Sequence, residues 1–98
     1  MKADEICRTA AELVSGDRAA THGDKRKNHE HIAAFWTTYL TQVGVMPLHF
    51  RLQGVDVTNM MELLKIARRL AGQHNDDDYI DAAGYAGIAG QLAGENDE

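Results

Sequence analysis

Two groups of charged residues in the second half of the chain have spacings that suit phosphate or metal chemistry. Glu62, Lys65 and Arg68 recur every three residues, so they share one face of a helix. Asp78 and Asp81 are also three residues apart, which points two carboxylates the same way. Carboxylate oxygens are ligands for Mg²⁺, whereas lysine and arginine bind phosphate oxygens. These residue types indicate a place where basic and acidic side chains face each other.

A pair of helices joined by a short polar turn, within residues 56–94, is predicted to position these groups. The first helix is expected to be capped by Asp56 or Thr58 and to run to about Ala71. Acidic residues from Asp76 onward open the second helix, where the positive end of the helix dipole favours them. If the two helices fold back antiparallel, the basic residues face the acidic pair across the turn.

The second helix of this hairpin also predicts close packing. It contains Gly84, Gly87 and Gly90 among alanines, and each glycine costs roughly 1 kcal/mol relative to alanine inside a helix. Close approach of another helix usually offsets that cost, so we expect this face to lie against a neighbour. Asp81, one turn inside the helix, is expected to be partly buried and to need a partner.

Two further helices are predicted before the hairpin. The first covers about Ala3 to Val14, with apolar residues at helical spacing. A turn at His22-Gly23 precedes the second, which Asp24 caps and which runs to about Val43. Its apolar residues are expected to share one face, namely Ile32, Phe35, Trp36, Tyr39 and Leu40.

The segment that follows, residues 45–54, holds the only proline and has no clear period. We predict a packed connection anchored by Leu48 and Phe50. The resulting architecture is a single all-α domain, 1–98, of four helices, with the second to fourth forming the core and an acidic tail at 95–98. Association as a dimer or tetramer is expected, through the glycine-rich helix and the face that carries Trp36.

Composition excludes several classes of protein. A formal charge of −5 argues against general nucleic-acid binding, which needs a clustered excess of Lys and Arg. The single cysteine, Cys7, cannot form an internal disulfide, and no Cys/His cluster has zinc spacing. There is no apolar run long enough for a membrane span and no signal-peptide pattern. We therefore expect a cytoplasmic protein that binds neither nucleic acid nor membrane.

The hairpin resembles the core of the all-α nucleoside-triphosphate pyrophosphatase superfamily, the MazG-like proteins. The signature of that superfamily is two carboxylates three apart, a gap, and then two further acids three apart. The corresponding positions are Glu62, Lys65, Asp78 and Asp81, with twelve residues between Lys65 and Asp78. Three blocks resemble a small phage-associated branch of it: HGDKRKNHEHIAAFW, DVTNMMELLKIARRLAG and DDDYIDAAGYAGIA.

The resemblance implies a MazG-like helical bundle that is completed by oligomerisation and whose ligand is a nucleotide. Asp78 and Asp81 would be catalytic and, with Glu62, would hold Mg²⁺, which such hydrolysis needs. Lys65 departs from the signature, because a lysine binds phosphate but cannot ligate Mg²⁺. The residues expected to contact phosphate or nucleotide are Lys65, Arg68 and Tyr85, together with Lys25 and Asn28. The last two belong to a basic run at a helix start, where free backbone N–H groups attract anions, although such a run is also typical of a solvated loop.

Three functions follow from these residues. The first is a Mg²⁺-dependent pyrophosphohydrolase that converts a nucleoside triphosphate to the monophosphate and pyrophosphate. The second is a catalytically degenerate phage protein that binds or sequesters a nucleotide, with Lys65 marking the lost metal ligand. The third is a structural or interaction protein in which the charged cluster is an interhelical ion-pair network. Tyr85 could stack on a base or pack in the core.

Overall fold

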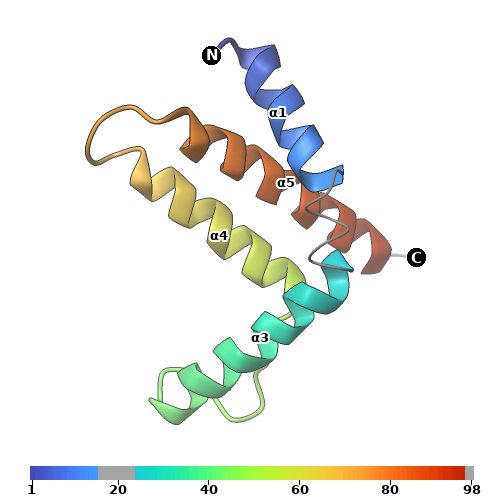
Figure 1. Ribbon diagram of the computed structural model, residues 1–98. Coiled ribbons are helices and arrows are strands. Elements are labelled where there is room, and N and C mark those ends of the chain that lie inside the picture. The colour runs from blue at the N-terminus through green and yellow to red at the C-terminus, as the bar shows by residue number, and fades with distance from the viewer. Residues whose placement is uncertain (16–23, 97–98) are drawn as a thin grey trace.

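The computed structural model describes residues 1–15 and 24–96, which form four helices (Figure 1). The helices are α1 (Ala3–Ser15), α3 (Lys25–Gln42), α4 (Gly54–Arg68) and α5 (Asp76–Asn96). No strand occurs in these two ranges, so the all-α prediction is confirmed. No helix within them is long and apolar enough to cross a bilayer. The predicted turn at His22-Gly23 and the last two residues of the predicted tail lie outside the described residues.

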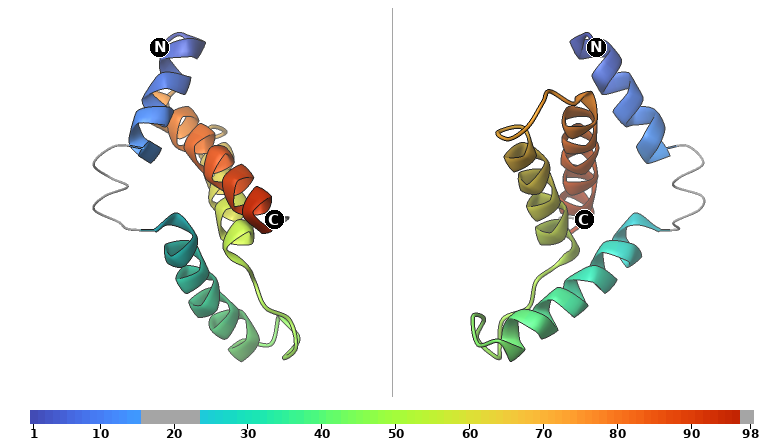
Figure 2. Two further views of the ribbon diagram at one scale, coloured as in Figure 1. Left: turned by 90° about the vertical axis from the view of Figure 1, so that its right-hand side faces the viewer. Right: turned by 60° about the vertical axis from the view of Figure 1, so that its left-hand side comes forward.

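The antiparallel hairpin of α4 and α5 forms the centre of the molecule. Its core contains Val57 and Thr58 of α4 and Leu92 of α5, all fully buried. α1 packs on α5, whereas α3 packs on α4 and leads away from the hairpin (Figure 2). The prediction that the second to fourth helices form the core is therefore only partly right, because α1 also contributes by packing on α5.

Asp24 caps α3 as predicted. Its side chain accepts a hydrogen bond from the backbone N–H of Lys27 at 3.1 Å, which satisfies one of the free donors of the first turn. Gly44 follows the end of the helix with φ of +82°, a conformation that suits glycine. Both ends of this helix were therefore encoded locally.

The predicted start of α4 is wrong. The helix begins at Gly54 with Gln53 as N-cap, before the expected caps Asp56 and Thr58. Asp56 still contributes to the helix start, because its carboxylate accepts a hydrogen bond from the backbone N–H of Gln53 at 2.8 Å. It does so from the third helical position as part of a capping box, in which side chain and backbone satisfy each other.

The connection between α3 and α4 is not anchored as predicted. Leu48 is 87% exposed and Phe50 is 46% exposed, so neither side chain is buried as an anchor within the described residues. A hydrogen bond to α3 holds the connection instead. The backbone N–H of Leu52 donates to the side-chain hydroxyl of Thr37 at 2.9 Å.

Close packing at the glycines of α5 is confirmed at one position of three. A Cβ at Gly84 would lie 3.4 Å from a methyl group of Val14, so α1 approaches α5 there. A Cβ at Gly87 or Gly90 would meet no atom within 4 Å. The neighbour expected along the whole glycine face is therefore absent from the described part of this chain.

Candidate functional site

The turn between α4 and α5 brings the two predicted groups of charged residues together. Gly72 lies in this turn with φ of +73°, which glycine adopts without strain. The two helices then run antiparallel (Figure 1). The end of α4, with Lys65 and Arg68, therefore faces the start of α5, with Asp78 and Asp81.

Lys65 pairs with Asp81 across the hairpin. The distance from Nζ of Lys65 to Oδ2 of Asp81 is 3.1 Å, and the exposed fractions of the two side chains are 15% and 30%. Because both charges are largely withdrawn from water, salt screens their interaction less than it screens a surface pair. The expectation that Asp81 is partly buried and partnered is confirmed.

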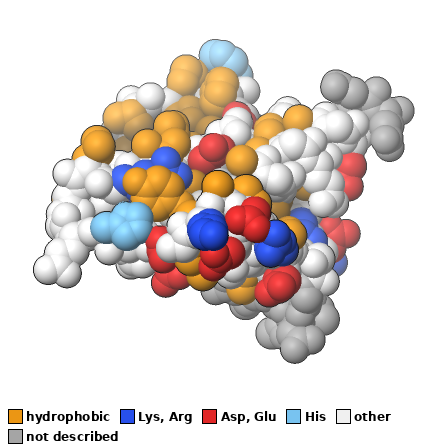
Figure 3. Space-filling view, turned by 90° about the horizontal axis from the view of Figure 1, so that it is seen from above, with side chains coloured by type: hydrophobic (Ala, Val, Ile, Leu, Met, Phe, Trp, Pro, Cys, Tyr) orange, Lys and Arg blue, Asp and Glu red, His pale blue; other side chains and the backbone are white. Residues whose placement is uncertain are grey.

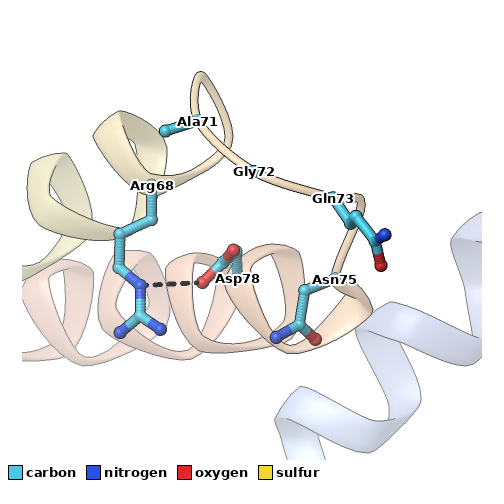
Figure 4. Close-up of a pocket in the computed structure, with 6 residues that line it drawn as sticks. All are labelled: Arg68, Ala71, Gly72, Gln73, Asn75 and Asp78. Atoms are coloured by element: carbon cyan, nitrogen blue, oxygen red, sulfur yellow. Dashed lines mark ion pairs between the residues drawn. The ribbon is translucent and has the colours of Figure 1, made fainter.

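Arg68 pairs with Asp78 one helical turn closer to the connection between α4 and α5. The Nε of Arg68 lies 3.4 Å from Oδ1 of Asp78, and the Asp78 side chain is 9% exposed against 55% for Arg68. The terminal nitrogens of Arg68 point away from Asp78 (Figure 4). A guanidinium has five N–H donors, so this geometry leaves donors on its outer side for a second acceptor.

An open hollow of about 340 Å³ lies beside the Arg68–Asp78 pair. Arg68 and Asp78 form one side of it and the turn passes across the other (Figure 4). The remaining lining residues come from the turn: Ala71, Gly72, Gln73 and Asn75. This volume is at the lower limit of small-molecule sites, which span ~300–1,000 Å³. It could admit a phosphate or part of a nucleotide.

Glu62 does not join the two aspartates. The two ion pairs define the register of the antiparallel helices. Lys65 lies three residues before Arg68 on α4, and its partner Asp81 lies three residues after Asp78 on α5. The next step places Glu62 level with Gly84, a residue without a side chain.

The acidic residues of the hairpin do not form a ligand set for Mg²⁺. Within residues 1–15 and 24–96 no group of three His, Cys, Asp or Glu side chains is placed to hold a metal ion. Asp78 and Asp81 already face cations, and a hard divalent ion needs several oxygen ligands around it. The described residues therefore offer no ready three-ligand site, and a Mg²⁺ ion held by Asp78 and Asp81 would need further oxygen ligands from a bound phosphate.

The other residues implied to contact nucleotide lie farther away. Tyr85 is one turn beyond Asp81 on α5 and is partly buried. Lys25 and Asn28 lie at the start of α3, next to the opposite end of α5, where Arg26 binds Leu92. Eleven residues of helix from Asp81 to Leu92 correspond to about 16 Å. One phosphate cannot contact both groups in a single chain.

The basic run at the start of α3 has a structural role through Arg26. Its guanidinium donates to the backbone carbonyl of Leu92 at 2.6 Å and to the carboxylate of Glu95 at 3.1 Å. It also lies 3.5 Å from Glu30, whose carboxylate accepts the N–H of Gly54 at 3.0 Å. The sequence shows the basic run, but it gives no sign that the partners come from the end of α5.

A second cluster at the start of α5 was not predicted as an interaction. Nε2 of His74 lies 2.8 Å from Oδ1 of Asp76, and the N-terminal ammonium of Met1 lies 3.4 Å from the other oxygen. The hydrogen bond from His74 is the main cause that lowers the pKa of Asp76, and the ammonium group adds to it. Seen from above, acidic and basic side chains are interspersed (Figure 3).

Comparison with known proteins gives one family and two relatives. The model of the family described as "Domain of unknown function (DUF6378)" matches residues 5–93. The chain is 40% identical over 93 residues to the Gene 55 protein of Mycobacterium phage L5, covering 95% of this chain and 55% of that protein. It is 32% identical over 89 residues to the Gene 55 protein of Mycobacterium phage D29, covering 91% of this chain and 54% of that protein. The chain thus spans about half the length of these relatives, and no solved structure matches it.

Proposed function

The chain belongs to the DUF6378 family, and from that premise we propose that it binds nucleotide phosphates on a MazG-like scaffold without a metal ion. The observation that supports this is the replacement of an acid-against-acid slot by two cation–carboxylate pairs, Lys65–Asp81 and Arg68–Asp78. Lys65 stands where the resemblance expects a metal ligand.

The pairing leaves both cations able to bind an anion. Asp78 forms an ion pair on the Nε side of Arg68, so the terminal nitrogens can donate to two phosphate oxygens. Lys65 has three donors, and Asp81 faces one side of the ammonium group. The aspartates hold the two cations in place, which reduces the side-chain entropy lost on binding. The aspartates also neutralise the charges of Lys65 and Arg68. A triphosphate should bind more tightly than a monophosphate, because it offers more oxygen atoms that accept hydrogen bonds from these two side chains.

The phage relatives favour a cytoplasmic setting for this proposal. Both are proteins of mycobacteriophages. Nucleotides are abundant in the cytoplasm of an infected cell, and a phage protein that binds them there would sequester a host nucleotide.

The test is a thermal-shift screen against nucleoside triphosphates, monophosphates and cyclic nucleotides, each with Mg²⁺ and with EDTA. A ligand that binds only the native state raises the melting temperature. We expect a shift with triphosphates that persists in EDTA and is lost in Arg68→Gln. Arg8→Gln is the matched control, because Arg8 is an exposed arginine on α1 that also pairs with an aspartate. Absence of a shift with every nucleotide would refute binding and leave the ion-pair network as a structural feature.

A Mg²⁺-dependent pyrophosphohydrolase is the second candidate. The observation in its favour is that two partly or fully buried carboxylates, Asp78 and Asp81, lie one turn apart on the same face of α5. Pyrophosphate release from a triphosphate would support it, with turnover lost in Asp81→Asn and raised in Lys65→Glu. A thermal shift that requires Mg²⁺ would also favour this candidate over the metal-free one.

A further inference from the structure

The longest stretch without formal charge lies on α3 and the connection after it. From His31 to Phe50 the sequence contains no Asp, Glu, Lys or Arg, although such residues make up 26% of the chain. Charged residues flank this stretch directly, with Glu30 before it and Arg51 after it. A solvated helix of this length would normally carry charges on its outer side.

Large apolar side chains on this stretch are exposed. Phe35 and Tyr39, one helical turn apart, are 65% and 66% exposed, and Val43 continues the same stripe of α3. The stripe is followed by exposed apolar residues of the connection. We call the whole set the uncharged face: Phe35, Tyr39, Val43, Val45, Leu48 and Phe50.

The outer side of α4 has the same character. Between Asn59 and Ala67 the only charged residues are Glu62 and Lys65, which are both partly buried, and Lys65 pairs with Asp81 of α5. The exposed positions include Met60, Leu63 and Leu64. Hydrophobic side chains accordingly gather along one side of the molecule in Figure 3.

The chain is also less compact, and exposes more surface, than is typical of a folded monomer of its length. Its radius of gyration is 14.9 Å, whereas about 13 Å is typical of a compact chain of this length. Its accessible surface is 6846 Å², whereas about 5,500 Å² is typical of a folded monomer of 10.8 kDa. The excess is on the order of 1,000 Å², and a standard interface removes about 800 Å² from each partner. One further chain would therefore bring the exposed area to the usual range.

We propose that the uncharged face is the contact surface for a second copy of this chain. In a two-fold dimer the same patch meets itself, so any charge near the axis lies close to an identical charge. The chain as a whole carries −5, yet this face carries no formal charge and can meet itself without repulsion. Burial of its apolar area supplies the driving force.

Of the two surfaces expected from the sequence, this proposal keeps α3, where Phe35 and Tyr39 are exposed, and leaves out the glycines of α5. That helix has room for another helix at Gly87 and Gly90, but its exposed side there offers mainly glycine, alanine and Gln91. The large apolar side chains that dominate interface energetics lie on α3 and the connection instead.

The test is the mass in solution, by light scattering after size exclusion, of the wild type, Phe35→Glu and Gly87→Glu. We expect a dimeric wild type, a monomeric Phe35→Glu and a dimeric Gly87→Glu. Phe35 is mostly exposed in one chain and Gly87 has free space around it, so neither change should unfold the monomer. A monomeric wild type at 100 µM, or dissociation by Gly87→Glu but not by Phe35→Glu, would overturn the proposal.

Hydrogen exchange on the wild type gives a second test that does not depend on a variant. Amides of residues 35–50 should exchange several-fold more slowly at high than at low protein concentration, whereas those around Gly87 should not change. Protection that is independent of concentration would show that this face is not a contact between copies.

Discussion

The two ion pairs of the hairpin differ in which partner is more shielded from water. In the Lys65–Asp81 pair the lysine side chain is the more buried of the two, so removal of the carboxylate leaves a cation poorly solvated. The Arg68–Asp78 pair is reversed, because there the carboxylate is buried and the guanidinium reaches solvent. The two pairs should therefore respond differently to the loss of one partner.

The first prediction concerns the Lys65–Asp81 pair. Asp81→Asn should lower the free energy of unfolding by about 1–3 kcal/mol, because it leaves Lys65 without its charged acceptor. The double variant Lys65→Met/Asp81→Leu should cost less than Asp81→Asn alone, since neither charge is then left unpaired. Urea denaturation measures both.

Arg8→Ala is the control for this prediction. Arg8 and Asp4 form an exposed pair on α1, and its loss should change stability by less than about 1 kcal/mol. If Asp81→Asn cost no more than Arg8→Ala, the Lys65–Asp81 pair would be equivalent to a surface pair.

The second prediction concerns pH and the cluster at Asp76. Since the folded pKa of Asp76 is lowered from 3.8, its ionised form contributes stability above that pH, and the contribution is lost as the pH falls through the folded pKa. His74→Ala removes the main cause and should raise the pKa of Asp76 towards 3.8. The N-terminal ammonium remains in the variant, so the return should be incomplete.

NMR titration of the side-chain carboxyl groups measures this pKa directly. His49→Ala is the matched control, because His49 is an exposed histidine on the connection between α3 and α4. An unchanged pKa of Asp76 in His74→Ala would show that the hydrogen bond is not its main cause.

The spacing of single residues predicted the pairing across the hairpin but not all of its consequences. Helical periodicity was enough to place Lys65 and Arg68 opposite Asp81 and Asp78. Periodicity could not show that Glu62 falls level with a glycine, because that depends on the register of two helices.

At the level of helices, Gly54 and Gly87 differ in how closely another helix approaches them. A Cβ at Gly54 would lie 3.0 Å from the Glu30 carboxylate and 3.3 Å from the Glu30 backbone nitrogen. Gly54 also donates its N–H to that carboxylate, so α3 and α4 touch at this point. A Cβ at Gly87, in contrast, would meet no atom of another described element within 4 Å.

The third prediction uses this difference. Gly54→Ala should lower the free energy of unfolding by about 1–3 kcal/mol, because the backbone of α3 must move. Gly87→Ala should raise it by up to about 1 kcal/mol through helix propensity alone. Thermal unfolding of both variants at one protein concentration measures the two effects. A destabilising Gly87→Ala would mean that another helix does pack on this face.

The helices were predicted well and their junctions poorly. Turn residues and caps such as Asp24, Gly44 and Gly72 are local signals, so the order of the helices in the described residues followed from them. The start of α4 at Gly54 and the exposure of Leu48 depend on contacts between α3 and α4, which no local pattern contains.

For the molecule as a whole, Arg26 joins the ends of three helices. It lies on α3, binds a carbonyl and a carboxylate near the end of α5, and contacts Glu30, which in turn binds the start of α4. A cation at the end of a helix also interacts favourably with its dipole. Arg26 therefore adds a link from α3 to the end of α5 beside the hydrogen bond that joins Glu30 of α3 to the start of α4.

The fourth prediction tests this role. Arg26→Met should remove hydrogen-exchange protection from the last turn of α5 and lower the free energy of unfolding by about 1–3 kcal/mol. Lys25→Met is the matched control and should leave that protection unchanged. Equal effects of the two variants would show that Arg26 acts only through the overall charge of the run.

The packing of α1 on α5 has a consequence for biosynthesis. The hairpin of α4 and α5 is closed by a short turn, so it can form as soon as both helices have been made. Among the described helices α1 is translated before α5, which packs on it, and α3 and α4 are made in between. Ile6, Ala10, Leu13 and Val14 must therefore remain uncovered on the ribosome while the rest of the chain is made.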